Sequence, residues 1–193
     1  MVWLSSLDPL PARPRRVLVA GTSGSGKSTL ARQVAGQLGL PYVEIDALFH
    51  GPGWTPRPTF VAEVADLARS DSWSTEWQYE VARDLLGNRA DLVVWLDLPR
   101  VVVLRQVVRR TVGRRLRRSE LWNGNVEPPL LTFFTDPEHI VRWAWSTHGL
   151  AGPRLVQLAR LRLDLPIVRL RSRRDVRRWL AGPLAASTAL QQP

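Results

Sequence analysis

The chain has 193 residues, 45% of them hydrophobic, and a formal net charge of +10. This length and hydrophobic content allow one domain with a substantial core and are too small for two ordinary domains. No stretch reaches the roughly 18 apolar residues that span a bilayer, and the first residues lack the features of a secretory signal. We therefore expect a cytoplasmic protein without membrane association. The absence of cysteine excludes disulfides, thiolate zinc sites and cysteine nucleophiles.

The basic charge is only weak evidence for a nucleic-acid partner. Lys27 is the single lysine, so 26 of the 27 basic residues are arginine. Together with the abundance of alanine, leucine, valine and proline, this indicates a compositional bias of the source genome rather than a binding surface. Nucleic acid stays a possible partner that the sequence does not favour.

Short apolar runs alternate with amphipathic segments along the chain. Strands are expected at residues 15–20, 42–45, 73–77, 91–98 and 167–170. Helices are expected at residues 27–38, 59–69, 81–86, 100–118, 138–146, 154–163 and 173–180. Residues 1–14, with three prolines, are expected to form an irregular lead-in and residues 182–193 a flexible tail, which leaves one domain over 15–181. The alternation predicts a three-layer α/β/α fold around a mostly parallel sheet of about five strands.

A glycine-rich loop connects the first expected strand to the first expected helix. The loop and the residue after it read Gly21, Thr22, Ser23, Gly24, Ser25, Gly26, Lys27, Ser28 and Thr29. This is the spacing of a P-loop, or Walker A motif, in which successive backbone N–H groups and the positive end of the next helix hold phosphates. Lys27 would reach the β- and γ-phosphates, and the Ser28 hydroxyl would bind Mg²⁺. The sequence therefore predicts ATP and Mg²⁺ as cofactors bound at this loop.

Carboxylates stand at the ends of three expected strands. The carboxyl ends of parallel strands meet at one edge of a sheet, where ligands bind. Asp97 is a candidate to order Mg²⁺, directly or through water, and equally a turn residue before Pro99. Asp46 is a candidate catalytic residue that binds an acceptor hydroxyl or takes its proton. Glu76 is another carboxylate near a strand end, but the aromatic residues that flank it would equally fit a position in the core.

The expected helix at residues 100–118 carries eight arginines in 19 residues. Arg105, Arg109 and Arg110 recur at i, i+4 and i+5 and share one helical face. Such a face is a solvated surface, a nucleic-acid footprint, or a lid whose guanidiniums stabilise charge during phosphoryl transfer. We favour an arginine-rich lid helix, with Arg105 and Arg109 as catalytic candidates that also contact the nucleotide. Arg110 joins them as a nucleotide-binding candidate.

The order of these motifs resembles that of the adenylate-kinase-like small P-loop kinases, and within them the bacterial AAA-family ATPases or DNA topology modulation proteins. The resemblance covers roughly residues 15–181 and rests on the segments 21–28, 45–54, 94–99, 100–118 and 121–125. It implies an acceptor side at about residues 46–69 and a lid entered through the arginine helix. Relatives commonly carry Asp-Gly-Asn-Tyr where this chain has residues 76–79, so the bulky Trp77 puts the shape of the acceptor pocket in question.

Three functions are compatible with these features. The favoured one is a kinase that transfers the γ-phosphoryl group of ATP to an unidentified nucleotide or small-molecule acceptor. The alternative is a nucleic-acid-associated ATPase or nucleotide-dependent switch, and the third is a nucleotide-binding scaffold without catalysis. One compact kinase-like domain without a nucleic-acid module favours the first. The sequence indicates neither the acceptor nor the oligomeric state.

Overall fold

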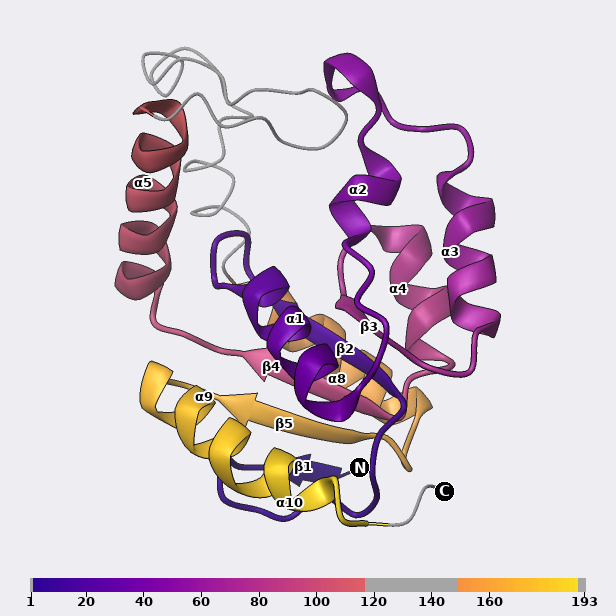
Figure 1. Cartoon of the computed structure of the whole chain (residues 1–193), viewed down its shortest axis with the longest axis vertical. Helices are drawn as coiled ribbons and strands as arrows, with labels where there is room; N and C mark the ends of the chain where they lie inside the picture. The colour runs from indigo at the N-terminus through magenta and orange to yellow at the C-terminus, as the bar shows by residue number, and fades with distance from the viewer. Residues whose placement is uncertain (1, 117–148, 191–193) are drawn as a thin grey trace.

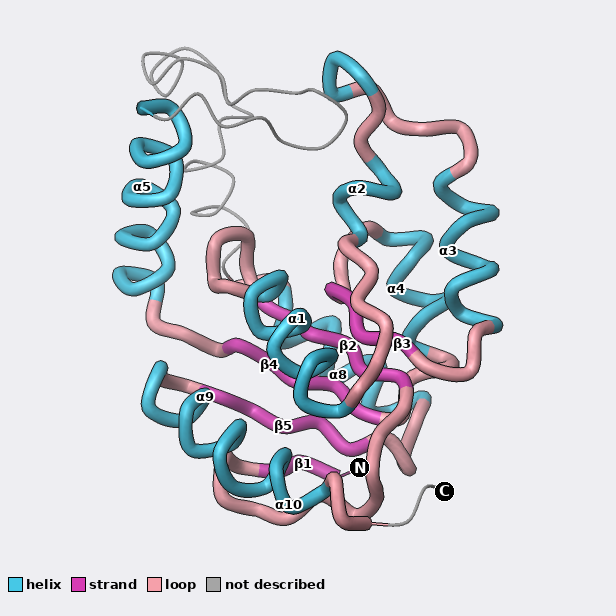
Figure 2. The backbone as a smooth tube through the Cα atoms, in the orientation of Figure 1, coloured by secondary structure: helices cyan, strands magenta, loops and turns pink. Residues whose placement is uncertain are grey.

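The fold is built on one parallel sheet of five strands. The computed structural model describes residues 2–116 and 149–190. Its strands are β1 (Val2–Leu4), β2 (Arg16–Gly21), β3 (Trp73–Glu76), β4 (Leu92–Leu96) and β5 (Pro166–Leu170). They are arranged in the order β1-β5-β4-β2-β3, and every neighbouring pair is parallel (Figures 1 and 2). The predicted parallel sheet is confirmed, and the P-loop leaves the carboxyl end of the strand between β4 and β3.

Helices cover both faces of this sheet. The described helices and helical turns are α1 (Lys27–Leu38), α2 (Ile45–Phe49), η1 (Pro52–Trp54), α3 (Phe60–Arg69), α4 (Glu80–Gly87), α5 (Arg100–Leu116), α8 (Ala151–Leu161), α9 (Arg173–Trp179), η3 (Leu180–Leu184) and α10 (Ala185–Ser187). Within β2, Val17 and Val19 pack with α1 and α9, whereas Leu18 and Ala20 pack with α3, α4 and α8. Because successive strand residues face opposite sides, one strand contributes to two cores. The predicted three-layer α/β/α fold is confirmed.

Both chain ends differ from the prediction. Residues 1–14 are not an irregular lead-in throughout, because Val2–Leu4 pair in parallel with β5 and extend the sheet. Residues 182–190 are not a flexible tail, because the chain stays helical through Ser187 and buries Leu184 completely. Pro183 lies inside a wide, π-type helical turn over Leu180–Leu184. Residues 191–193 lie outside the described part.

The expected strand at residues 42–45 is also wrong. Only Tyr42 forms a bridge, to Ser74, and the chain then turns into α2 at Ile45. Asp46 therefore lies in the first turn of a helix instead of at a strand end. The expected helix at residues 138–146, the segment 121–125 and the last two residues of the arginine helix lie outside the described residues. None of the described helices is long and apolar enough to cross a membrane.

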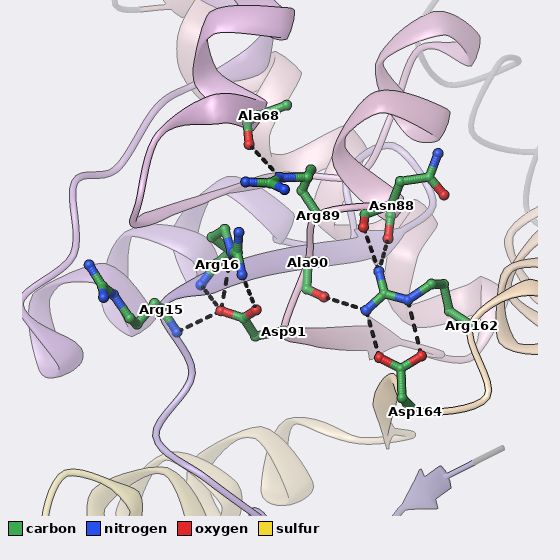
Figure 3. Close-up of polar contacts among 10 residues, drawn as sticks. Arg15, Arg16, Ala68, Asn88, Arg89, Ala90, Asp91, Arg162 and Asp164 are labelled. Carbon is green, nitrogen blue, oxygen red and sulfur yellow. Dashed lines mark hydrogen bonds and ion pairs between the residues drawn. The ribbon is translucent and has the colours of Figure 1, made fainter. Parts of the chain in front are cut away.

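A polar network fastens the amino-terminal edge of the sheet (Figure 3). The Asp91 carboxylate accepts hydrogen bonds from the backbone N–H groups of Arg15 and Arg16, at 3.2 and 2.9 Å, and from the Arg16 guanidinium at 2.8 Å. Arg162 donates to the carbonyls of Asn88 and Ala90, at 2.7 and 3.3 Å. These hydrogen bonds link β2, α4, β4 and α8 at the amino ends of the strands, opposite the P-loop. They stabilise the sheet that positions the loop.

Candidate active site

The P-loop has the backbone shape that a phosphate requires. Gly24 and Gly26 have φ angles of +79° and +98°, values that glycine adopts without steric cost. The N–H of Ser25 donates to the Thr22 carbonyl at 3.0 Å, and Gly26 forms the cap of α1. The first turn of α1 contains no acidic residue and its cap makes no side-chain hydrogen bond. Its N–H groups and positive dipole end can therefore bind an anion.

Lys27 lies at the centre of the site. Its side chain is buried, with 8% exposure, and Nζ donates a 3.3 Å hydrogen bond to the Thr22 carbonyl. Burial lowers the pKa of Lys27, whereas the charges of Asp46 and Glu76 raise it and that of Arg110 lowers it. The lysine is thus held among groups from α2, β3 and α5. The loop also lies between α5 and the group formed by α2, α3 and α4 in Figure 1.

Two further features of the loop fit a bound phosphate. A Cβ built on Gly26 would meet only Gln106 Oε1 within 4 Å, at 3.9 Å, so the backbone there is accessible to a ligand. The Ser25 hydroxyl is buried and has no hydrogen-bond partner in the described part of the chain. Ser28 is half-buried and Thr29 exposed at the start of α1. The residues present are consistent with the phosphates that the sequence predicts at this loop.

Asp46 is held by hydrogen bonds from neutral donors. Its Oδ1 accepts from the Tyr79 hydroxyl at 2.7 Å and from the side-chain amide of Gln78. The Tyr79 hydroxyl also lies 3.1 Å from Nε2 of His50. Burial and then the charge of Asp46 raise the pKa of Tyr79, so its hydroxyl keeps its proton and donates a hydrogen bond to the carboxylate. The carboxylate consequently has a fixed orientation.

An aromatic cluster of Phe49, His50, Trp54, Phe60 and Tyr79 surrounds this hydrogen-bond chain. Phe49 stacks on Tyr79 with ring centroids 4.0 Å apart, and Trp54 meets His50 edge-on at 5.1 Å. Trp54 and Tyr79 are the two described non-glycine residues with positive φ, at +62° and +59°. Such conformations are strained and occur preferentially at functional sites. The rings of both strained residues contact the ring of His50, and Tyr79 also donates a hydrogen bond to Asp46.

Glu76 has a larger role than its sequence context indicated. It is only 1% exposed and accepts hydrogen bonds from the Tyr42 hydroxyl at 2.8 Å and from the backbone N–H of Ile45 at 3.0 Å. The second bond satisfies an N–H group at the start of α2, so Glu76 sets where the helix that carries Asp46 begins. Trp77, the departure noted above, is 7% exposed, packs in the core and donates to the Arg83 carbonyl at 3.1 Å.

Replacing Glu76 with alanine should destabilise the fold by about 3–5 kcal/mol, because the change leaves the Tyr42 hydroxyl, the Ile45 N–H and the charge of Lys27 without their buried partner. Urea unfolding of the nucleotide-free protein measures the difference. The exposed carboxylate Glu80 provides a control, since Glu80→Gln should change the free energy of unfolding by less than about 1 kcal/mol. Equal losses for the two variants would contradict the role given to Glu76.

Asp97 forms an ion pair with a strand neighbour. Its Oδ2 accepts from Nε and Nη2 of Arg169 at 2.8 and 2.5 Å, and the guanidinium of Arg169 lies 4.5 Å from the centroid of the Trp95 ring. β5 brings Arg169 there, opposite Trp95 on β4. No group of three or more histidine, cysteine, aspartate or glutamate residues in the described ranges could hold a metal ion. The metal-binding roles of Ser28 and Asp97 therefore stay predictions.

The arginine helix packs directly against the P-loop. A Cβ on Gly24 would lie 2.0 Å from Cγ2 of Val107, so α5 touches the tip of the loop. Arg105 and Arg109 are exposed, whereas Arg110 is half-buried and its charge acts on Lys27. Sequence reasoning selected the right helix but missed Gln106 and Val107, which carry no charge. Gln106 and Val107 follow Val103 by three and four residues, so they share a helical face with that buried residue. This spacing is the one sequence signal that could have identified them.

Comparison with known proteins agrees with this geometry. Residues 17–74 match the model for the ATPase family associated with various cellular activities (AAA). A cytidylate kinase from Nitratidesulfovibrio vulgaris is 44% identical over 48 residues, which are 25% of this chain and 21% of that protein. This chain therefore aligns with only about a fifth of that relative's length.

Solved structures extend the likeness to most of the chain. A sugar kinase from Janibacter sp. HTCC2649 has a TM-score of 0.50 and 22% identity, covering 94% of this chain and all of the other. A shikimate kinase from Acinetobacter baumannii, in complex with shikimate, has a TM-score of 0.53 and 15% identity over 90% of this chain and 88% of the other. The chain has the fold of the small P-loop NTPases and kinases. The resemblance inferred from its motifs is thereby confirmed at this level.

The sequence match covers a smaller part of this P-loop protein than the structural likeness does. The family match includes β2, the loop, α1, α2 and α3, and it ends at Ser74. Glu76, Tyr79 and the whole of α5 lie beyond it. At 15–22% identity the structural likeness describes the fold alone. The roles of these later residues rest on the contacts that they make in this structure.

Proposed function

We propose that the protein is a Mg²⁺-dependent phosphotransferase that passes the γ-phosphoryl group of ATP to a hydroxyl group of a small-molecule acceptor. The observation that carries the proposal is the proximity of two functional groups on different elements. The charge of Asp46, on α2, acts directly on Lys27 of the P-loop. The carboxylate is thus near enough to the phosphate site for its charge to act there, and transfer to a hydroxyl requires a base and a phosphate site to be close together.

The loop would bind and orient the phosphates. Its N–H groups and the start of α1 donate to phosphate oxygens, Lys27 reaches the β- and γ-phosphates, and Ser28 with Asp97 would hold Mg²⁺. The metal would neutralise charge that builds up on the transferring group. On α5 we assign the electrostatic role to Arg110, which acts on Lys27. For Arg105 and Arg109, whose side chains are exposed, catalysis stays a prediction.

Asp46 would receive the proton of the acceptor hydroxyl. Tyr79 and Gln78 both donate to Oδ1, so the carboxylate is oriented before the acceptor arrives. Fixing the base in this way removes the cost of orienting it during the reaction. The residue that differs from the related motif does not obstruct this side, since Trp77 is packed in the core.

The acceptor class is supported by the known proteins that share the fold. The relatives include a cytidylate kinase, and the structural neighbours are named as a sugar kinase and a shikimate kinase. The names of these proteins give a nucleotide, a sugar and shikimate as their substrates. We therefore propose a nucleotide or a small hydroxylated metabolite as the acceptor here.

A panel of nucleosides, nucleoside monophosphates, sugars, polyols and hydroxy acids, assayed for ADP release with Mg²⁺ and ATP, tests the proposal. One acceptor should stimulate ADP release at least tenfold over the rate without acceptor, and the Lys27→Met variant should not respond. If no compound in the panel stimulates ADP release, the proposal of a small-molecule kinase is wrong. ATP hydrolysis stimulated by DNA or RNA, with binding that weakens steeply with salt, would favour the nucleic-acid-associated ATPase instead.

A further inference from the structure

Buried polar atoms without partners gather where the P-loop meets α5. Ser25 Oγ, Gln106 Nε2 and Thr111 Oγ1 are all buried and have no hydrogen-bond partner in the described part of the chain. Ser25 belongs to the loop, and the other two to the helix that packs against it. An unsatisfied buried donor destabilises a fold, and native proteins retain few of them. Their concentration at this contact points to a polar ligand that completes their hydrogen bonds.

On α5, Gln106 lies beside the phosphate-binding backbone. Its side-chain oxygen is 3.9 Å from where a Cβ of Gly26 would stand, and Gly26 precedes Lys27. The neighbouring Val107 fills the contact with Gly24, so the helix is held against the loop. Arg110, one turn further on, acts on Lys27. Packing of Val107 on Gly24 thus places the Gln106 amide at the loop, with Oε1 as the nearer atom, and a 180° turn of the terminal amide would bring the donor Nε2 to the same position.

We propose that Gln106 is a nucleotide-binding residue whose amide donates a hydrogen bond to the phosphate chain held by the P-loop. The chemistry is matched, because phosphate oxygens only accept hydrogen bonds and the Gln106 amide nitrogen is a donor without a partner. This assignment rests on the proposed function, in that the loop binds a nucleotide. It adds to the site an uncharged hydrogen-bond donor from α5, a helix whose other polar candidates are charged arginines.

The Gln106→Met variant tests the assignment, since methionine keeps the length of the side chain and removes the amide. Titration calorimetry should give an ADP dissociation constant about tenfold higher than that of the original protein, the size expected for losing one hydrogen bond to a charged group. Gln106→Glu should weaken ADP binding further, because its carboxylate repels phosphate. Gln157→Met, at an exposed position on α8, should leave the constant unchanged.

A second measurement separates binding from a structural role. Without nucleotide, the melting temperature of Gln106→Met should stay equal or rise, because an unsatisfied buried amide has been removed. With ADP, the increase in melting temperature should be smaller than for the original protein. Unchanged ADP affinity, or a lower melting temperature without nucleotide, would overturn the assignment. If the original protein and Gln157→Met both failed to bind ADP, the proposed function would be wrong as well as the assignment of Gln106.

Discussion

Replacing Lys27 with methionine is expected to reduce phosphoryl transfer by about 10³-fold or more, a change of at least about 4 kcal/mol in transition-state stabilisation. The ammonium is the only lysine charge in the chain and is buried among Asp46, Glu76 and Arg110. In such a site its attraction for the transferring phosphoryl group is screened little by water. Methionine fills a similar volume, so packing around the loop is retained. Rates of ADP formation with the acceptor identified by the panel measure the effect.

The matched controls for Lys27→Met address charge and shape separately. Arg173→Met removes one positive charge from an exposed position on α9 and should leave the rate within twofold. Lys27→Arg keeps the charge but replaces a compact ammonium by a planar guanidinium, so it should recover only a part of the rate. A Lys27→Met enzyme that kept more than a tenth of the original rate would rule out the role assigned to this residue.

Asp46→Asn is expected to lower the turnover number by about 10²- to 10⁴-fold, the range for losing a positioned general base. Asparagine keeps the shape of the side chain, and its carbonyl oxygen can still accept from Tyr79. It cannot take a proton from the acceptor hydroxyl. Because the proposal places Asp46 on the acceptor side, the ADP dissociation constant should change by less than about threefold. Single-turnover rates and calorimetric titrations with ADP measure the two quantities.

Asp66→Asn provides the comparison for Asp46→Asn. Asp66 lies on the exposed side of α3, where it pairs with Arg69 at the surface, and its loss should leave the turnover number unchanged. Should Asp46→Asn turn over as fast as Asp66→Asn, proton acceptance must be assigned to another group. A large fall in ADP affinity without a fall in turnover would instead indicate that Asp46 acts through Lys27.

The parts of the fold that the sequence predicted well are those with a strong local signal. The glycine loop and the apolar period after it predicted α1 over Lys27–Leu38, the range that the structure has. The failure at residues 42–45 has a tertiary cause. The short segment at residues 42–45 fitted a strand, but the Glu76 carboxylate, 31 positions later, satisfies the N–H of Ile45 and starts a helix there. No local pattern reveals such a capping group.

The candidate site was predicted in the same uneven way. The P-loop was recognisable because its backbone conformation imposes glycines at fixed positions. Asp46 was selected for the wrong structural reason, a strand end, yet its charge acts on Lys27 of the P-loop. On α5, charge drew attention to Arg105 and Arg109, which are exposed, while the uncharged Gln106 was overlooked. Helical spacing identifies residues that share a face, but only packing on Gly24 determines which face meets the loop.

The position of β1 also determines when the sheet can be finished. Val2–Leu4 pair only with β5 among the described strands, in register with Pro166–Val168, so β1 cannot join the sheet until β5, more than 160 residues later, has been made. Contacts this distant in sequence form late, because a long loop must close first. β2, β3 and β4 can associate beforehand and assemble the P-loop. During synthesis the phosphate site should therefore form before the edge of the sheet is complete.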